Sequence, residues 1–292
     1  MKESLFDRSA VERLLLMAGA LRSGLIDALA AADVTGPLTS TEVAAKASAD
    51  ERACRVILEA LVAEGLAERV ATEAAQAVTE DTASVAAEPS PKTGKSEPSA
   101  GSPGDAYRLG IGGLGGTSAS RESEPRYVLT EVARQHLVEE GPERERYSLL
   151  HQANKLRGWL TLPEVIRTGK PVPPDPAQRD WETMALAMGE RDQEVLQEVV
   201  ERCLAYAGRI STMLDVGGAV GHVARQFARC GVRATLLDRP EVMPFAKRFL
   251  GAEAANIALV GGDFTEGLPS GPFDLVYLGN VTHIYGPETN VR

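Results

Sequence analysis

The sequence has few aromatic residues, few cysteines and no long apolar run. Phe, Trp and Tyr make up 5% of its 292 residues. Its three cysteines, Cys54, Cys203 and Cys230, stand far apart, and this excludes a disulfide framework and a cysteine-rich metal site. No apolar run approaches the roughly 20 residues of a membrane helix, and the N-terminus lacks a signal-peptide core. We therefore expect a cytoplasmic protein without a membrane partner and without a bound metal.

Basic residues are also scarce. Lys and Arg number 31 against 41 Asp and Glu, which gives a net charge of −10. A general nucleic-acid partner is therefore not expected, because phosphate contacts require a basic face. Residues 71–125 contribute 8 acidic and 4 basic side chains to that balance and are rich in Ala, Ser, Gly and Pro. This composition predicts a disordered insertion, and its G-x-G-x-x-G run (Gly110–Gly115) lacks the preceding strand of a nucleotide site.

Around this insertion, the pattern predicts a mainly helical module over residues 1–142. Apolar residues at helical spacing predict one amphipathic helix over 9–31, and residues 38–70 are typical of a helix-turn-helix followed by a strand. Residues 66–70 and 126–130 form a predicted hairpin, so the module is interpreted as a winged helix with residues 71–125 at the wing tip.

Local signals mark the helix ends inside this module. Thr39–Glu42 and Ser48–Glu51 both match the capping-box pattern, in which Ser or Thr precedes Glu by three positions. Gly65 stands where a helix C-terminus favours a left-handed residue. Two helices are therefore expected between residues 39 and 65.

Residues 143–206 are predicted to form a helical connector. A long helix is expected near 180–206, with a break before it at 169–176. Trp159, Met184 and Met188 are consistent with core packing. The alternative is that they line a pocket for a substrate.

From residue 207 to 292 the pattern changes to alternating strands and helices. Strands are predicted at 210–216, 234–237, 257–260 and 273–278, with helices at 220–229 and 241–250. Such alternation is typical of a parallel sheet covered on both faces, so this part belongs to the α/β class. A further loop and helix begin at His283, with Pro287 at a first-turn position.

The first strand of this part leads into a glycine-rich turn. Asp215 is followed by Gly217, Gly218 and Gly221, whose lack of side chains lets the backbone approach a ligand closely. The spacing is not that of a dinucleotide site, and Asp215 would repel a pyrophosphate but would suit a cofactor with positive charge. The alternative is a tight strand-to-helix turn with an acidic cap.

Two more carboxylates follow the next two strands. Asp238 comes about 20 residues after the glycine turn, where an acidic residue can accept hydrogen bonds from both ribose hydroxyls. Asp263 follows the third strand. Because ligands bind at the carboxyl ends of parallel strands, these acids predict one binding edge, although each alone could be a helix cap.

The stretch Leu214–Tyr285 resembles the cofactor half of S-adenosylmethionine-dependent O-methyltransferases, in particular the small-molecule enzymes with an N-terminal winged-helix dimerisation domain. The matching pieces are Asp215–Gly221, Leu237–Val242, Gly262–Phe264 and Asn280–His283. The resemblance implies a Rossmann-like class I methyltransferase domain at residues 207–292 and a homodimer through residues 1–142. Relatives have seven strands and this chain has four, so it is expected to be truncated at its C-terminus.

The resemblance also implies roles for single residues. Asp215, Gly217, Gly218 and Gly221 would border the methionine part of S-adenosylmethionine, Asp238 would hold the ribose, and Asp263 and Phe264 would contact the adenine. Gly279 and Asn280 occupy a further cofactor-contact position, and Ala219 replaces a glycine common in the family. His283 falls where many relatives have a general base, which suits deprotonation of a phenol near neutral pH.

The function expected from these observations is methyl transfer from S-adenosylmethionine to a hydroxyl of a small aromatic or polycyclic metabolite. Two alternatives remain open. One is a winged-helix transcription regulator with a ligand-binding domain, in which Lys46, Arg52 and Arg55 would face DNA. The other is an inactive methyltransferase fragment. His136, His151 and His222 are interpreted as structural or solvated.

Overall fold

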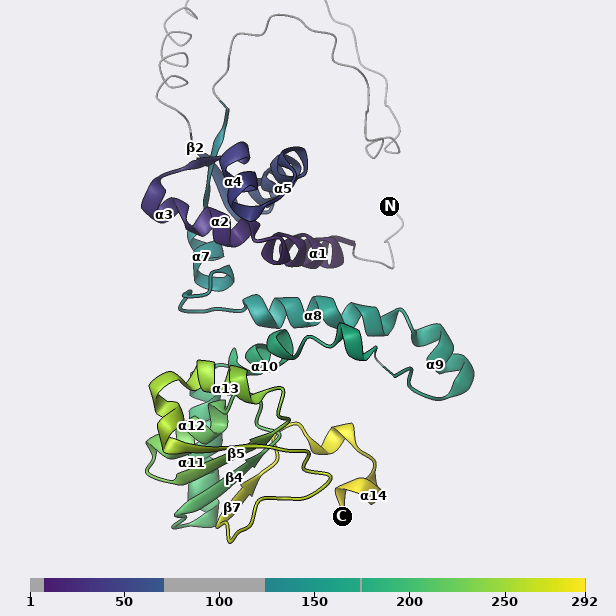
Figure 1. Cartoon of the computed structure of the whole chain (residues 1–292), viewed down its shortest axis with the longest axis vertical. Helices are drawn as coiled ribbons and strands as arrows, with labels where there is room; N and C mark the ends of the chain where they lie inside the picture. Colours follow the sequence, from purple (N-terminus) through teal and green to yellow (C-terminus); the bar gives the residue numbers. More distant parts are fainter. Residues whose placement is uncertain (1–7, 71–123, 174, 292) are drawn as a thin grey trace, which may run out of the picture.

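A computed structural model describes residues 8–70, 124–173 and 175–291. The G-x-G-x-x-G run and nearly all of the predicted insertion lie outside these residues. The described chain is arranged in three tiers (Figure 1): an N-terminal helical region, a middle tier built on helix α8 (Arg146–Trp159), and a parallel sheet with its helices. The α/β class with a helical N-terminal region is confirmed.

The N-terminal region contains six helices among the described residues. They are α1 (Arg8–Arg22), α2 (Leu25–Ala30), α3 (Ala32–Thr35), α4 (Ser40–Ala47), α5 (Glu51–Ala63) and α7 (Glu131–Leu137). The prediction of a single helix over 9–31 is wrong. Gly24 adopts a left-handed conformation with φ 74°, which ends α1 and lets α2 turn back into the core.

A three-stranded sheet completes this region. It has the order β1 (Leu38–Thr39), β3 (Arg126–Leu129), β2 (Ala67–Val70), and both pairings are antiparallel. The predicted hairpin pairing is confirmed, with Ala67 opposite Leu129, and β1 is a third strand that the pattern did not indicate. The ring of Tyr127 is fully buried beneath the sheet, and its hydroxyl donates to Glu59 at 2.6 Å.

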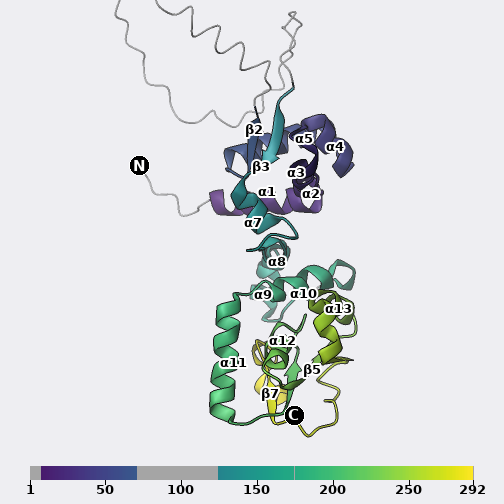
Figure 2. The ribbon, with the colours of Figure 1, turned by 90° about the vertical axis from the view of Figure 1, so that its left-hand side faces the viewer.

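The middle tier connects this region to the sheet. It consists of α8, α9 (Leu162–Thr168), the short turn η1 (Pro176–Gln178) and α10 (Trp181–Gly189), and it is followed by α11 (Gln193–Ala207), which packs on the sheet. The predicted single helix over 180–206 is interrupted: Glu190 ends α10, and Asp192 caps α11 by accepting from the backbone N–H of Glu194. Figure 2 shows α8 between the N-terminal region and the rest of the molecule.

The last part is a four-stranded parallel sheet in the order β6-β5-β4-β7. Its elements are β4 (Thr212–Val216), α12 (His222–Arg229), β5 (Arg233–Asp238), α13 (Met243–Leu250), η2 (Gly251–Asn256), β6 (Ile257–Gly261) and β7 (Leu275–Tyr277). After β7 come η3 (Thr282–Ile284) and α14 (Pro287–Asn290), where Pro287 occupies the predicted first turn. All four predicted strands are confirmed, with small shifts of their ends.

The two faces of this sheet are covered differently. Met213 and Leu236 point to the face covered by α11, α12 and α13, where they pack with Phe227 and Leu250. Leu214, Val216 and Leu237 point to the other face and pack with Phe264 and Phe273, which come from the segment after β6. This alternation places successive side chains on opposite faces, as a strand requires. It also leaves the carboxyl ends of the strands free to border a cavity.

Among the described residues, no single helix is long and apolar enough to cross a membrane. Two helical segments, Ala10–Arg22 and Leu25–Thr35, meet the length and composition requirement only when they are counted as one. They are inclined to each other by 69°.

Candidate active site

A cavity of about 700 Å³ lies at the carboxyl ends of β4, β5 and β6. It brings together most of the site residues that the sequence predicts, namely Asp215, Gly217, Gly218, Asp238, Asp263, Phe264, Gly279, Asn280, His283, Met184 and Met188. The cavity is also the size expected for a small-molecule ligand. Residues far apart in the sequence therefore share one wall, as the rule for parallel sheets requires.

Two predicted residues lie elsewhere. Gly221 does not line the cavity; it precedes α12 with φ 79° and packs against Leu236 and Leu250. Trp159, at the end of α8, is 65% exposed and lines a separate hollow of about 870 Å³. That hollow shares only His151, Trp181 and Met184 with the cavity.

The glycine turn after β4 requires small residues for steric reasons. Gly217 has φ 66°, and a Cβ there would lie 2.8 Å from Val281. A Cβ on Gly218 would lie 2.6 Å from Leu236 and even closer to the carboxyl of Asp215. Ala219 adopts φ 53° although it carries a Cβ, a conformation that costs about 1 kcal/mol. These small residues let the turn adopt a conformation in which its backbone borders the cavity.

Asp215 is almost fully enclosed, with 1% of its surface exposed. Its Oδ2 accepts a hydrogen bond of 3.2 Å from the backbone N–H of Ala224, so the carboxyl also caps α12. Burial raises the pKa of Asp215 to about 7, and the neighbouring charge of Asp238 adds to this. The carboxyl of Asp215 therefore caps α12 and also lines the cavity.

Asp238 joins the glycine turn to the end of β5. Its Oδ2 accepts from the backbone N–H of Ala219 and its Oδ1 accepts from that of Arg239, both at 2.7 Å. Burial raises the pKa of Asp238, and these two hydrogen bonds oppose the shift. Each oxygen keeps a further lone pair, so the carboxylate can accept from ligand hydroxyls.

Asp263 and Phe264, for which the sequence predicts adenine contacts, both line the cavity. Asp263 accepts from Thr265 at 2.6 Å and 2.9 Å and pairs with Arg239 at 3.2 Å, and these contacts of its carboxylate lower its pKa. Phe264 meets the ring of Tyr285 edge-on, with centroids 5.5 Å apart. Tyr285 thus extends the aromatic wall from the segment that follows His283.

Asn280, His283 and Arg191 also line the cavity. Asn280 adopts φ 58°. With its side-chain amide assigned so that the oxygen faces Arg191, that oxygen accepts from the guanidinium at 2.8 Å and 3.3 Å. His283 lies in η3, on the cavity wall. Gly279 packs so tightly on Tyr277 that a Cβ would come within 2.6 Å of its ring.

Several cavity residues were not predicted from the sequence, among them Arg191 and His222. Arg191 lies between α10 and α11 and forms no ion pair with any residue that the structure describes. His222, which we interpreted as structural or solvated, is 7% exposed, and its Nδ1 has no hydrogen-bond partner within the described ranges. Burial, together with the charges of Arg191 and Arg225, lowers the pKa of His222 to about 4. Its place directly after Gly221 was the signal that could have assigned it to the site.

The cavity therefore carries charges of both signs. Asp238 and Asp263 supply carboxylates, and Arg191 supplies a guanidinium that forms no ion pair with any residue that the structure describes. Such an arrangement can accept hydrogen bonds from ligand hydroxyls and can also bind an anionic group.

Residues 177–291 match the O-methyltransferase domain family over a stretch that includes every strand of the parallel sheet. This part of the chain is similar to that family. The match of the O-methyltransferase domain begins at η1 and ends with α14, so it contains the whole glycine turn and His283.

Individual relatives agree with this assignment. The chain is 31% identical over 108 residues to pluviatolide O-methyltransferase of Sinopodophyllum hexandrum, which is 36% of this chain and 27% of that protein. It is 29% identical over 180 residues to the tetracenomycin polyketide synthesis 8-O-methyl transferase TcmO of Streptomyces glaucescens, covering 57% of this chain and 52% of TcmO. The chain thus spans about half or less of these curated relatives.

A solved structure shares the fold over a longer region. The crystal structure of human N-acetylserotonin methyltransferase in complex with SAM superposes with a TM-score of 0.56 at 21% identity, covering 98% of this chain and 74% of the human one. This likeness extends the shared fold beyond the O-methyltransferase domain into the N-terminal region.

Proposed function

We propose that this protein binds S-adenosylmethionine in the cavity and transfers its methyl group to a hydroxyl oxygen of a small aromatic or polycyclic metabolite. The observation that carries the proposal is the joint placement of Asp215, Asp238 and Asp263 beside the glycine turn, within a domain of the O-methyltransferase family. Similarity to enzymes whose names describe O-methylation supports the reaction class.

The residues present fit this cofactor. The cavity offers a carboxylate with free lone pairs at Asp238, an aromatic wall at Phe264 and a backbone turn kept close by Gly217 and Gly218. Asp238 would hold the ribose hydroxyls, Asp263 and Phe264 the adenine, and Arg191 the methionine carboxylate. Asp215, Gly279 and Asn280 would complete the contacts, while Gly221 would act by shaping the turn.

When bound, S-adenosylmethionine supplies an electrophilic methyl carbon on a positively charged sulfur. Catalysis then depends on holding the acceptor oxygen in line with that carbon at near-attack distance. His283 would accept the proton of the acceptor hydroxyl as the new carbon–oxygen bond forms, and the sulfur would keep the electron pair of the broken bond. Met184 and Met188 would contact the acceptor, and Trp159 would contact only an acceptor that extends beyond the cavity.

Calorimetric titration with S-adenosylmethionine tests the cofactor assignment. Asp238→Asn should weaken binding at least about tenfold, because it removes charge-assisted hydrogen bonds. Asp274→Asn is a matched control, since Asp274 also accepts from backbone N–H groups, of Ser211 and Thr212, but does not line the cavity. A folded wild-type protein without affinity, or an unchanged affinity in Asp238→Asn, would contradict the proposal.

The general-base role is tested separately. With hydroxylated aromatic acceptors, His283→Ala should keep cofactor affinity and lose about 10²- to 10⁴-fold in the rate of methyl transfer. Full turnover by this variant would remove His283 from the mechanism while leaving the cofactor assignment intact.

We also propose that the chain is divided at about residues 142 and 206, and that the N-terminal part serves as a winged-helix dimerisation domain. The three-stranded sheet on α4 and α5 supports this, as does the half-exposed Leu15 on α1. Sedimentation should show a dimer, and Leu15→Glu should weaken it. A monomer at all concentrations would contradict this part of the proposal.

A further inference from the structure

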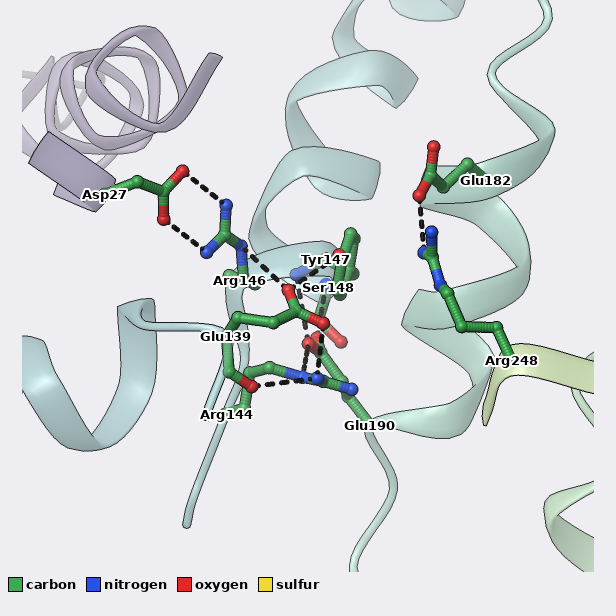
Figure 3. Close-up of polar contacts among 9 residues, drawn as sticks. All are labelled: Asp27, Glu139, Arg144, Arg146, Tyr147, Ser148, Glu182, Glu190 and Arg248. Atoms are coloured by element: carbon green, nitrogen blue, oxygen red, sulfur yellow. Dashed lines mark hydrogen bonds and ion pairs between the residues drawn. The ribbon is translucent and has the colours of Figure 1, made fainter. Parts of the chain in front are cut away.

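The bend between α10 and α11 is held by a buried carboxylate. The side chain of Glu190 is 1% exposed. Its Oε2 accepts from the backbone N–H of Ser148 at 2.7 Å, and its Oε1 accepts from that of Tyr147 at 3.2 Å and from Nε of Arg144 at 3.0 Å (Figure 3). Burial raises the pKa of Glu190, and the two backbone hydrogen bonds oppose that shift. The carboxylate is fully engaged and has no direct access to the cavity.

These contacts tie the bend to the N-terminus of α8. The N-cap residue of α8, Glu145, makes no side-chain cap hydrogen bond. Glu190 supplies the cap instead, from more than 40 positions away in the sequence, and its charge also suits the helix dipole there. Gly189, the residue before Glu190, has no room for a side chain. A Cβ there would lie 2.7 Å from Phe249 and 2.8 Å from Val220. The bend is therefore fixed on both sides.

Arg191 follows Glu190 directly and emerges from this bend into the cavity. There it donates to Asn280, and it has no carboxylate partner among the residues that the structure describes. A long, unpaired guanidinium has many rotamers, so its usefulness for binding depends on how firmly its backbone is placed. Among the described residues, its side chain makes only one other hydrogen bond, a long one of 3.9 Å to the sulfur of Met188.

We propose that Glu190 is a positioning residue: its buried contacts with α8 hold the backbone of Arg191 where the guanidinium meets the carboxylate of the methyl donor. The proposal depends on the function proposed above. It adds that ligand affinity is set partly by a carboxylate that touches neither the ligand nor the cavity.

A pair of ligands separates positioning from general stability. S-Adenosylhomocysteine carries the amino-acid carboxylate, whereas 5′-methylthioadenosine has only a methyl group on its sulfur and lacks the whole amino-acid part. By calorimetry, Glu190→Gln should weaken S-adenosylhomocysteine about tenfold and should leave 5′-methylthioadenosine unchanged, since only the former would reach Arg191. Glu139→Gln is the control. Glu139 accepts from Arg144 and Tyr147 in the same network but makes no hydrogen bond with Glu190 or Arg191 among the described residues.

A double-variant cycle shows whether Glu190 acts through Arg191. Arg191→Met should weaken S-adenosylhomocysteine alone, and adding Glu190→Gln to it should cause no further loss. If Glu190→Gln proves poorly folded by circular dichroism, Arg144→Gln removes one contact of the carboxylate and should give a smaller loss with the same ligand preference.

The outcomes that would overturn the inference are distinct. Equal weakening of both ligands in Glu190→Gln would show a structural role only. An unchanged Glu190→Gln beside a weakened Arg191→Met would refute positioning and leave the role of Arg191 intact. If Arg191→Met binds normally, both roles fail but the cofactor site stands, whereas a wild-type protein that binds neither ligand would refute the proposed function itself.

Discussion

At the residue scale, Asp215 and His222 have opposite effects on how stability depends on pH. The pKa of Asp215 is raised to about 7, so the folded protein keeps a proton that the unfolded chain releases above about pH 4. Its contribution to stability is therefore lost as pH rises toward 7. The pKa of His222 is lowered to about 4, so the unfolded chain takes up a proton that the folded protein excludes, and stability increases as pH rises toward 6.5.

Replacing one of these two groups should expose the contribution of the other to the pH dependence of the free energy of unfolding. Between about pH 4.5 and about pH 6, the free energy of unfolding of Asp215→Asn should rise relative to wild type by up to about 1.4 kcal/mol per pH unit. That of His222→Gln should fall relative to wild type over the same range. Urea unfolding at several pH values measures both slopes. Curves parallel to wild type would show that the folded state does not hold these two groups neutral.

Gly218 should tolerate no side chain. Gly218→Ala places a Cβ 2.6 Å from Leu236 and still closer to Asp215, and this overpacking should cost about 2 kcal/mol of stability. The control is Gly19→Ala in α1, where no atom lies within 4 Å of the new Cβ and where alanine should stabilise the helix by about 0.5–1 kcal/mol. Urea unfolding distinguishes the two, and equal effects would contradict the steric argument.

The sequence predicted best those site residues whose location follows from the strand that carries or precedes them. Asp215, Asp238 and Asp263 could be placed at one sheet edge because each directly follows or ends an apolar strand. Arg191 could not, because its access to the cavity depends on the bend between α10 and α11. Trp159 shows the opposite error, since an aromatic residue at helical spacing predicts burial but lies 65% exposed.

At the element scale, the residue that caps a helix is also hard to predict from the sequence. The box at Thr39 and Glu42 is confirmed, with both reciprocal hydrogen bonds present. The one expected at Ser48 and Glu51 is wrong: α5 is capped by Asp50, whose Oδ1 accepts from Ala53 at 2.8 Å, while Ser48 ends α4 with φ 53°. Two overlapping capping patterns in one turn cannot be ranked by spacing, because the choice depends on where α4 stops.

This difference predicts opposite effects for two neighbouring substitutions. Asp50→Ala should destabilise the protein by about 1 kcal/mol through loss of the cap. Ser48→Gly should be neutral or stabilise it by up to about 1 kcal/mol, because glycine adopts the left-handed conformation without strain. Thermal unfolding of both variants measures this, and a larger loss in Ser48→Gly would restore Ser48 as the cap.

At the scale of the whole molecule, α8 joins two cores. Leu150 and Ala153 on α8 belong to the N-terminal core, although the sequence assigned them to the connector. Tyr147, one turn earlier, packs both on that core and on the cluster of Ala185, Leu186 and Val220 beside the sheet. The periodicity of a single helix cannot show that it has two partners, so this link could be recognised only in the folded chain.

The polar counterpart of this link is the pair of Arg146 on α8 with Asp27 on α2. Two hydrogen bonds of 2.8 Å and 3.1 Å form a fork between them (Figure 3), and the Arg146 side chain is 11% exposed. Arg146→Met should lower the free energy of unfolding by about 2 kcal/mol, because Asp27 loses a bidentate partner at the junction of the two tiers. Arg202→Met, which breaks the exposed pair with Glu198 in α11, should cost at most about 0.5 kcal/mol. Both are measured by urea unfolding, with affinity for S-adenosylhomocysteine as a second measurement that neither substitution should change. If Arg146→Met proves no more destabilising than Arg202→Met, the apolar contacts of α8 alone join the two cores.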